Sequence, residues 1–82
     1  MIKILSENIT KSGDKIYHLH VPPPEMIYFG YIVESLEGWV FHTIIDKKDS
    51  ILHLEVIKDY VQEFEVVLKK LKVKSSQAKK VN

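Results

Sequence analysis

Residues 15–46, KIYHLHVPPPEMIYFGYIVESLEGWVFHTIID, contain in order the patterns of a strand, a helix and a second strand. Apolar and polar side chains alternate over Lys15–Val21, which is typical of a strand with one buried face. The prolines Pro22–Pro24 then keep the chain extended and suit the first turn of a helix. We expect this helix to end at Gly38 in a left-handed cap, after which alternation resumes over Trp39–Asp46.

The flanking sequence adds three expected elements. Ile51–Ile57 alternates like a third strand, and Asp59–Lys72 repeats apolar side chains at helical spacing, with Asp59 as the expected N-cap. Asp46–Ser50 is the expected hairpin loop between the second and third strands. Turn-forming residues over Lys11–Asp14 indicate another turn, so we expect an additional edge strand over Ile2–Ile9.

These elements predict an α+β fold of the two-layer sandwich class. A β-α-β crossover is right-handed, so the third strand can insert between the first two, antiparallel to both. The result is a βαββα ferredoxin-like (ACT-like) core with an antiparallel sheet, both helices on one face and the N-terminal strand at an edge. The alternative is an α+β arrangement with simple hairpin order. We expect a single domain over residues 1–73 and a disordered basic tail over residues 74–82.

Alternation also assigns a face to each strand. The sides expected to meet the helices consist, in the first strand, of Tyr17, Leu19 and Val21 and, in the third, of Leu52, Leu54 and Val56. In the second strand the bulkier set is the expected core side: Trp39, Phe41, Thr43 and Ile45. On the first helix, Gly30 lies within the apolar stripe and is expected to allow a close approach to the sheet.

Composition excludes several classes of function. The chain has 82 residues, no cysteine and a net charge of +1, so disulfides and thiolate metal sites are excluded. All twelve basic residues are lysine, and the lack of arginine argues against sequence-specific nucleic-acid recognition. Six of these lysines follow Glu65, and Lys69 is placed to pair with Glu65 one helical turn away.

No segment has the length and hydropathy of a signal peptide or membrane span, and a cytoplasmic location is expected.

Four histidines are the candidate metal ligands. If the faces are assigned correctly, they share the side of the sheet away from the helices: His18, His20, His42 and His53. A His-x-His pair on one strand is a spacing found in zinc, copper and nickel sites. The same pattern more often marks a polar sheet face that water or a second subunit covers, and it also fits a pH-sensitive interface.

Two further groups are candidate binding residues, and none is a candidate catalytic residue. Glu34, near the end of the first helix, and Thr43, on the next strand, form either a ligand site or a structural polar contact. Apolar side chains outside the expected core form the candidate interface: Ile16, Ile27, Tyr28, Tyr31 and Ile44.

The stretch Tyr17–Leu71 resembles a small, uncharacterised bacterial domain family known only as a domain of unknown function. The residues that carry the resemblance are Val21-Pro22-Pro23, the segment IVESLEG at 32–38, and Thr43-Ile44-Ile45-Asp46. The architecture is also similar to that of ACT modules, which bind amino acids and pair through their sheets. ACT modules usually carry a glycine where this chain has Pro22–Pro24.

Together these observations favour a noncatalytic module that forms homo-oligomers or binds a protein or small ligand. The alternatives are a histidine-based metal-binding protein and a weak RNA- or ribosome-associated protein acting through the lysine-rich tail. These three functions belong to different classes, and no motif in the sequence distinguishes among them.

Overall fold

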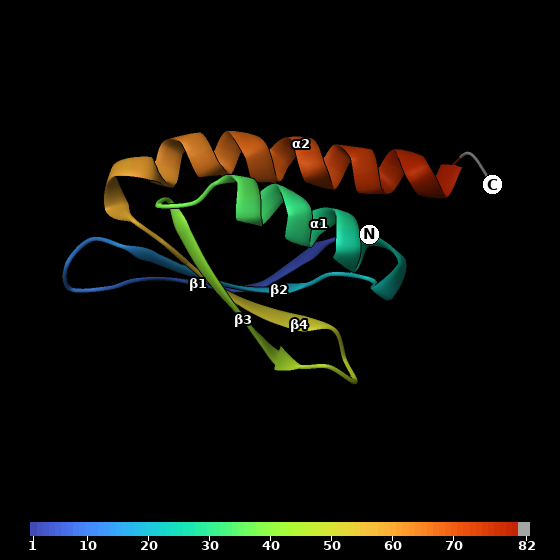
Figure 1. Ribbon diagram of the computed structural model, residues 1–82, viewed down its shortest axis with the longest axis horizontal. Helices are drawn as coiled ribbons and strands as arrows, with labels where there is room; N and C mark the ends of the chain where they lie inside the picture. The colour runs from blue at the N-terminus through green and yellow to red at the C-terminus, as the bar shows by residue number, and fades with distance from the viewer. Residues whose placement is uncertain (81–82) are drawn as a thin grey trace.

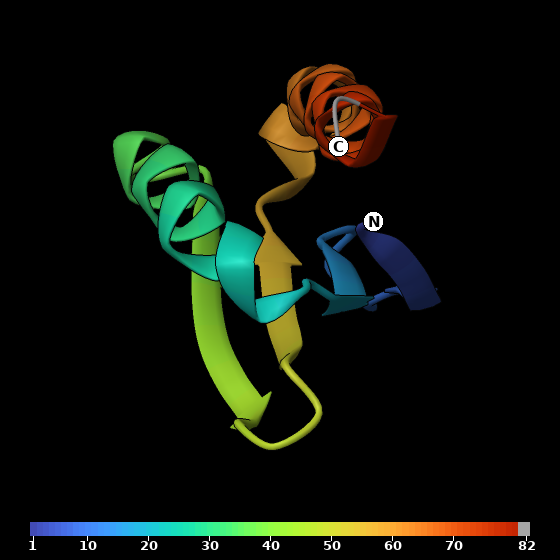
Figure 2. The same ribbon diagram turned by 90° about the vertical axis from the view of Figure 1, so that its right-hand side faces the viewer.

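The computed structural model describes the backbone of residues 1–80 and their side chains except at positions 42, 44 and 75–80. It contains four strands, β1 (Lys3–Ile9), β2 (Lys15–His20), β3 (Val40–Asp46) and β4 (Ile51–Val56). Its helices are α1 (Pro23–Ser35), the short 3-10 helix η1 (Lys58–Tyr60) and α2 (Val61–Lys80). Both α-helices lie on one side of the twisted sheet, as Figure 1 and Figure 2 show. The fold is therefore the expected two-layer α+β sandwich.

The strands form one sheet in the order β1-β2-β4-β3, and every neighbouring pair is antiparallel. Because β4 is antiparallel to both of its neighbours, β2 and β3 run parallel, with α1 as their crossover. This is the insertion that the sequence predicts for a ferredoxin-like core. The N-terminal strand β1 occupies the edge beside β2, which the last strand fills in a complete ferredoxin-like fold.

The core lies between the sheet and the two helices. The residues of the segments Lys15–Val21 and Ile51–Ile57 that were predicted to face the helices are buried, and Tyr17, Leu19 and Leu54 have no exposed surface. The helices contribute apolar side chains spaced three or four residues apart. The buried apolar residues are Ile2, Tyr17, Leu19, Val21, Phe29, Val33, Val40, Leu52, Leu54, Val56, Phe64, Leu68 and Leu71.

The core face of β3 differs from the expected one. Val40 is buried and pairs with Val56, whereas Phe41 and Thr43 are exposed and pair with Glu55 and His53. Cross-strand partners share a face, so the register with β4 places the bulkier residues on the outer side. The prediction was wrong because side-chain size does not determine which face of an edge strand is buried.

The helix ends largely follow the sequence signals. Helix α1 begins at Pro23 and ends at Ser35, and Gly38 in the following turn has a φ of +89°. Gly30 does not bring the helix close to the sheet, because an added Cβ there would meet no atom within 4 Å. That expectation is corrected.

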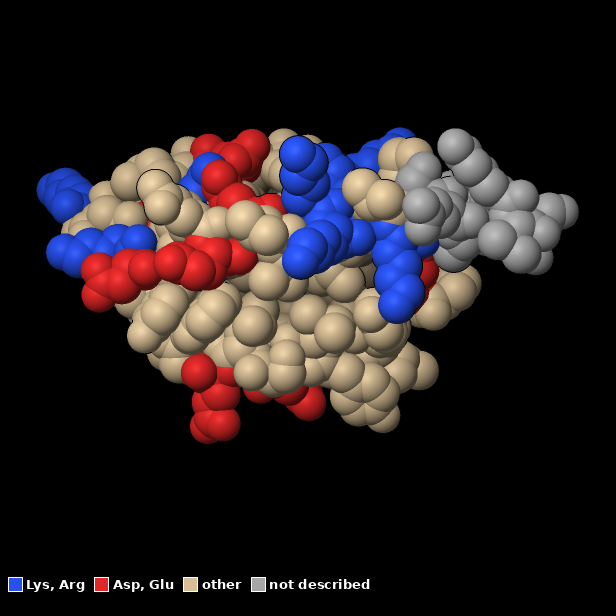
Figure 3. Space-filling model, turned by 90° about the horizontal axis from the view of Figure 1, so that it is seen from above, with Lys and Arg blue, Asp and Glu red and all other residues tan. Residues whose placement is uncertain are grey.

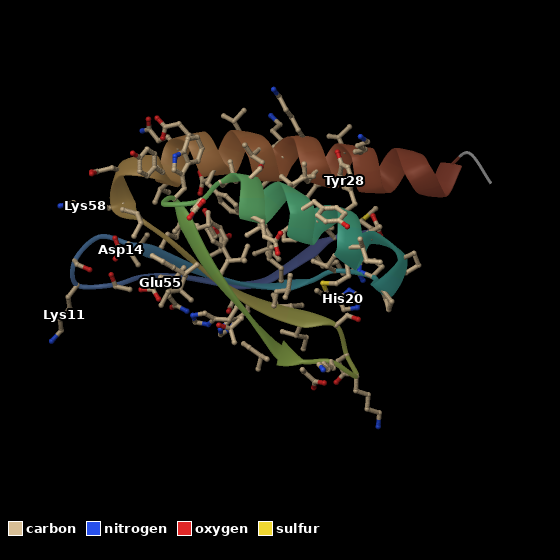
Figure 4. All side chains as sticks on the ribbon, in the orientation of Figure 1. Lys11, Asp14, His20, Tyr28, Glu55 and Lys58 are labelled. Carbon is tan, nitrogen blue, oxygen red and sulfur yellow. The ribbon has the colours of Figure 1, made fainter. Side chains whose placement is uncertain are left out.

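Helix α2 begins and ends later than the sequence indicates. It starts at Val61, and Asp59 lies in η1 rather than at an N-cap. Asp14 of the first hairpin accepts a hydrogen bond from the backbone N–H of Lys58 at 2.9 Å, and Figure 4 shows both residues at that end of the molecule. The helix continues to Lys80 through part of the expected tail, where the sequence contains no glycine or proline, and residues 81–82 lie outside the described part. Within residues 1–80, neither α-helix combines the length and hydropathy needed to cross a bilayer.

Candidate functional site

The outer face of the sheet, on the side opposite the helices, is the first candidate surface. Strand pairing arranges it in three rows that run across the strands. One end row contains Asn8, Ile16, Glu55 and Phe41, and the other contains Lys3, His20, Ile51 and Asp46. In Figure 4, Glu55 and His20 lie toward opposite ends of the sheet. The central row contains Ser6, His18, His53 and Thr43.

Three of the four side chains in the central row are connected by hydrogen bonds. The Oγ of Ser6 lies 3.1 Å from Nδ1 of His18, and Nε2 of His18 lies 3.0 Å from Nδ1 of His53. The two imidazole rings are tilted by 47° with centroids 5.0 Å apart. Strand register causes this contact, because His18 and His53 are direct cross-strand partners on β2 and β4. The face assignment of β2 and β4, unlike that of β3, thus places two of the four histidines in contact.

The other two histidines do not join this contact. His20 lies on the same face in the end row, beside Leu5 and Ile51, in a shallow pocket. The backbone of His42 pairs with Leu54, and its side chain lies outside the described residues. Among the side chains that the structure describes, no three His, Cys, Asp or Glu residues are arranged to hold a metal ion.

The Ser6–His18–His53 chain has the hydrogen-bond order of a nucleophile, a base and an orienting group. Acyl transfer also needs hydrogen-bond donors around the developing oxyanion. The backbone N–H groups of a sheet point along its plane toward neighbouring strands, so they do not surround Ser6 on this face. The geometry therefore favours a structural or binding role for the row over hydrolysis.

The proposed pair of Glu34 and Thr43 is not brought together. Glu34 is exposed on α1, and Thr43 is exposed on β3 opposite His53, on the far side of the sheet from the helices. Among the described residues, the Glu34 carboxylate has no hydrogen-bond partner, so the alternative structural contact is not formed either. The prediction failed because it rested on the incorrect face of β3.

The candidate interface residues fall into separate regions. Ile27 and Tyr31 lie one turn apart on α1 and are 70% and 67% exposed. Tyr28 instead contacts α2, where its Oη accepts a hydrogen bond from Lys74 at 2.9 Å, as its position beside α2 in Figure 4 suggests. Ile16 is half-buried on the outer face, and the side chain of Ile44 lies outside the described residues.

A cluster between the sheet and α2 was not predicted. The ammonium of Lys15 lies 2.6 Å from Glu65 and 2.8 Å from Glu7, and the Tyr17 hydroxyl donates to Glu65 at 2.9 Å. Lys15 and Glu65 are 50 positions apart, so no local sequence pattern indicates the contact. The expected partner of Glu65, Lys69, is not the residue that pairs with it.

The electrostatics of this cluster are unsuited to proton transfer. Hydrogen bonds with Glu65 and then Glu7 raise the pKa of Lys15, so its ammonium stays charged. Burial and then the hydrogen bond to Glu65 raise the pKa of Tyr17. Lys15 and then Tyr17 lower the pKa of Glu65. A catalytic lysine or tyrosine needs the opposite shift, so the cluster joins β1, β2 and α2 rather than acting as a base.

One family of known sequences matches most of the chain. A family described as a domain of unknown function (DUF4911) matches residues 19–74. The chain belongs to this family. The DUF4911 match begins within β2 and ends within α2, so β1 lies outside it. It confirms the resemblance to a small uncharacterised domain family. No curated protein and no solved structure matched the chain.

Proposed function

We propose that this domain is a noncatalytic association module that pairs with a second copy of itself through the outer face of the sheet. The observation that carries the proposal is the position of both helices on the opposite face, which leaves the outer face without a covering helix. Phe41 is 61% exposed, and Leu5, beside the other end row, is 52% exposed. Pairing through sheets is also how the ACT modules of similar architecture associate.

The distribution of charge on this face suits a symmetric pair. In a two-fold interface each patch meets the same patch of the other copy, so a large charge of one sign would repel its own copy. The central row contains no lysine or carboxylate, and the outer rows carry Lys3, Glu55 and Asp46, which include both signs. A second copy of the chain therefore meets serine, histidine and threonine side chains at the centre and apolar side chains such as Phe41 in the outer rows.

Sedimentation equilibrium of the wild type and of Phe41→Asp tests the proposal. The new carboxylate would lie opposite Glu55 in the register and would add negative charge to the proposed interface in both copies. We expect a dimer for the wild type and at least a roughly tenfold weaker dimer for the variant. Phe41 is exposed, so the variant should keep the wild-type circular dichroism spectrum.

Tyr31→Asp is the matched control, because it adds the same charge to an equally exposed aromatic residue on α1. We expect this control to remain dimeric. A wild type that stays monomeric at millimolar concentration would contradict the proposal. Loss of the dimer in Tyr31→Asp, with Phe41→Asp unaffected, would assign the interface to α1 instead.

The histidine-based metal site remains a second candidate function because of the contact between His18 and His53. Two copies paired through the central row would bring four imidazoles close together, and four nitrogen ligands suit zinc. Sedimentation with and without a chelator separates the candidates. A dimer that is insensitive to the chelator supports simple association. A dimer lost with the chelator, and lost in His18→Ala with His53→Ala, supports the metal site.

A further inference from the structure

A groove between β1 and α2 lies on the side of the sheet that the helices cover, away from the proposed interface. Its volume is about 400 Å³, which is within the range of pockets that hold small molecules. Its apolar wall consists of Ile4, Leu68 and Val73. Lys69 and Lys72 line the same groove from α2. It therefore combines an apolar body with cationic groups from one helix face.

The residues that line this groove, taken together with Lys15 beside them, carry a net positive charge. Glu7 and Glu65 both contact Lys15, and Glu65 also accepts the hydrogen bond from Tyr17. Lys69 and Lys72 have no acidic partner among the described residues. The groove is lined by two carboxylates and two ammonium groups, and Lys15, which contacts both carboxylates, adds a third ammonium group beside it. Figure 3 shows lysine side chains gathered over the C-terminal half of α2.

From this geometry we propose that the groove binds a small amphipathic carboxylate, with an apolar body and one anionic head. The apolar body packs along Ile4 and Leu68, and the carboxylate pairs with Lys69 and Lys72. A doubly charged anion without an apolar part would leave the apolar wall exposed to water, and a neutral lipid would leave both lysines unpaired. The site does not depend on the proposed dimer.

Titration with octanoate, followed by amide NMR shifts, tests the site, and 1-octanol is the matched neutral probe. For a ligand of this size we expect a Kd on the order of 1 mM. The largest shifts should occur at Ile4, Leu68 and Val73. Octanol should bind more weakly, because it lacks the charge that Lys69 and Lys72 attract.

The double variant Lys69→Gln/Lys72→Gln should bind octanoate about fivefold more weakly, since each exposed ion pair contributes a fraction of a kcal/mol. The control Lys70→Gln, which removes a lysine that does not line this groove, should bind as the wild type does. Equal affinity for octanol and octanoate would overturn the proposal. So would an equal loss in the control, largest shifts on the outer sheet face, or no saturable shifts.

Discussion

The Glu65 carboxylate accepts two hydrogen bonds that hold α2 to the sheet. Its donors are the Lys15 ammonium at 2.6 Å and the Tyr17 hydroxyl at 2.9 Å. Both come from β2, so one acceptor on the helix joins two side chains of the same strand. Because Glu65 pairs with Lys15, Lys69 lines the groove beside β1 without its expected acidic partner.

This arrangement predicts how stability depends on acid pH. Lys15 and then Tyr17 lower the pKa of Glu65 in the folded protein. As the pH is lowered, the Glu65 carboxylate therefore becomes protonated at a higher pH in the unfolded chain than in the folded protein. The stabilisation is present above the ordinary glutamate pKa of about 4.3 and is lost as pH falls through the lower folded value. Urea unfolding between about pH 6 and pH 3 should therefore show a weaker pH dependence in Glu65→Gln than in the wild type.

The control for this measurement is Glu63→Gln, which removes an exposed carboxylate on the same turn of α2. Glu63 has no hydrogen bond or ion pair among the described residues. The free energy of unfolding of this variant should therefore change with pH along the same slope as that of the wild type. An equal reduction of the slope in both variants would show that the Lys15–Glu65 contact does not determine the acid response.

At the scale of elements, the two glycines near α1 have opposite roles. Gly30 lies inside the helix, and a Cβ there would meet no atom within 4 Å. Gly30→Ala should raise the free energy of unfolding by about 0.5–1 kcal/mol, because alanine restricts the unfolded chain. Gly38 has a φ of +89°, so Gly38→Ala should lower the free energy of unfolding by about 1 kcal/mol or more. Urea midpoints of the two variants measure both effects, and shifts of the same sign would contradict this account.

The elements also show which features sequence patterns can predict. Alternation and turn residues are local, and they correctly predicted the strands, the helices and the insertion of β4 between β2 and β3. The face of β3 is not local, because it depends on which residue of β4 lies opposite Val40. The same difference between local and non-local features explains which parts of the candidate site could be predicted. His18 and His53 were predicted to share a face, whereas the Lys15–Glu65 contact joins residues 50 positions apart.

At the scale of the whole molecule, the sheet separates two surfaces of different chemistry. The outer face has apolar groups around a row of histidine, serine and threonine that contains no lysine or carboxylate. The groove lies on the other side, between β1 and α2, and combines apolar walls with lysines. No residue that lines the groove belongs to the three rows of the outer face.

This separation predicts that the two proposed binding events are independent. Phe41→Asp should weaken the dimer and leave the affinity for octanoate within about twofold of the wild type. The reverse should hold for Lys69→Gln/Lys72→Gln, which should bind octanoate weakly and keep the dimer. Sedimentation equilibrium with and without octanoate measures the dimer affinity, and NMR titration of both variants measures the affinity for octanoate. If octanoate shifts the dimer equilibrium in the wild type, the ligand must bind the two states differently, and a conformational link through β1 or β2 would have to join the two faces.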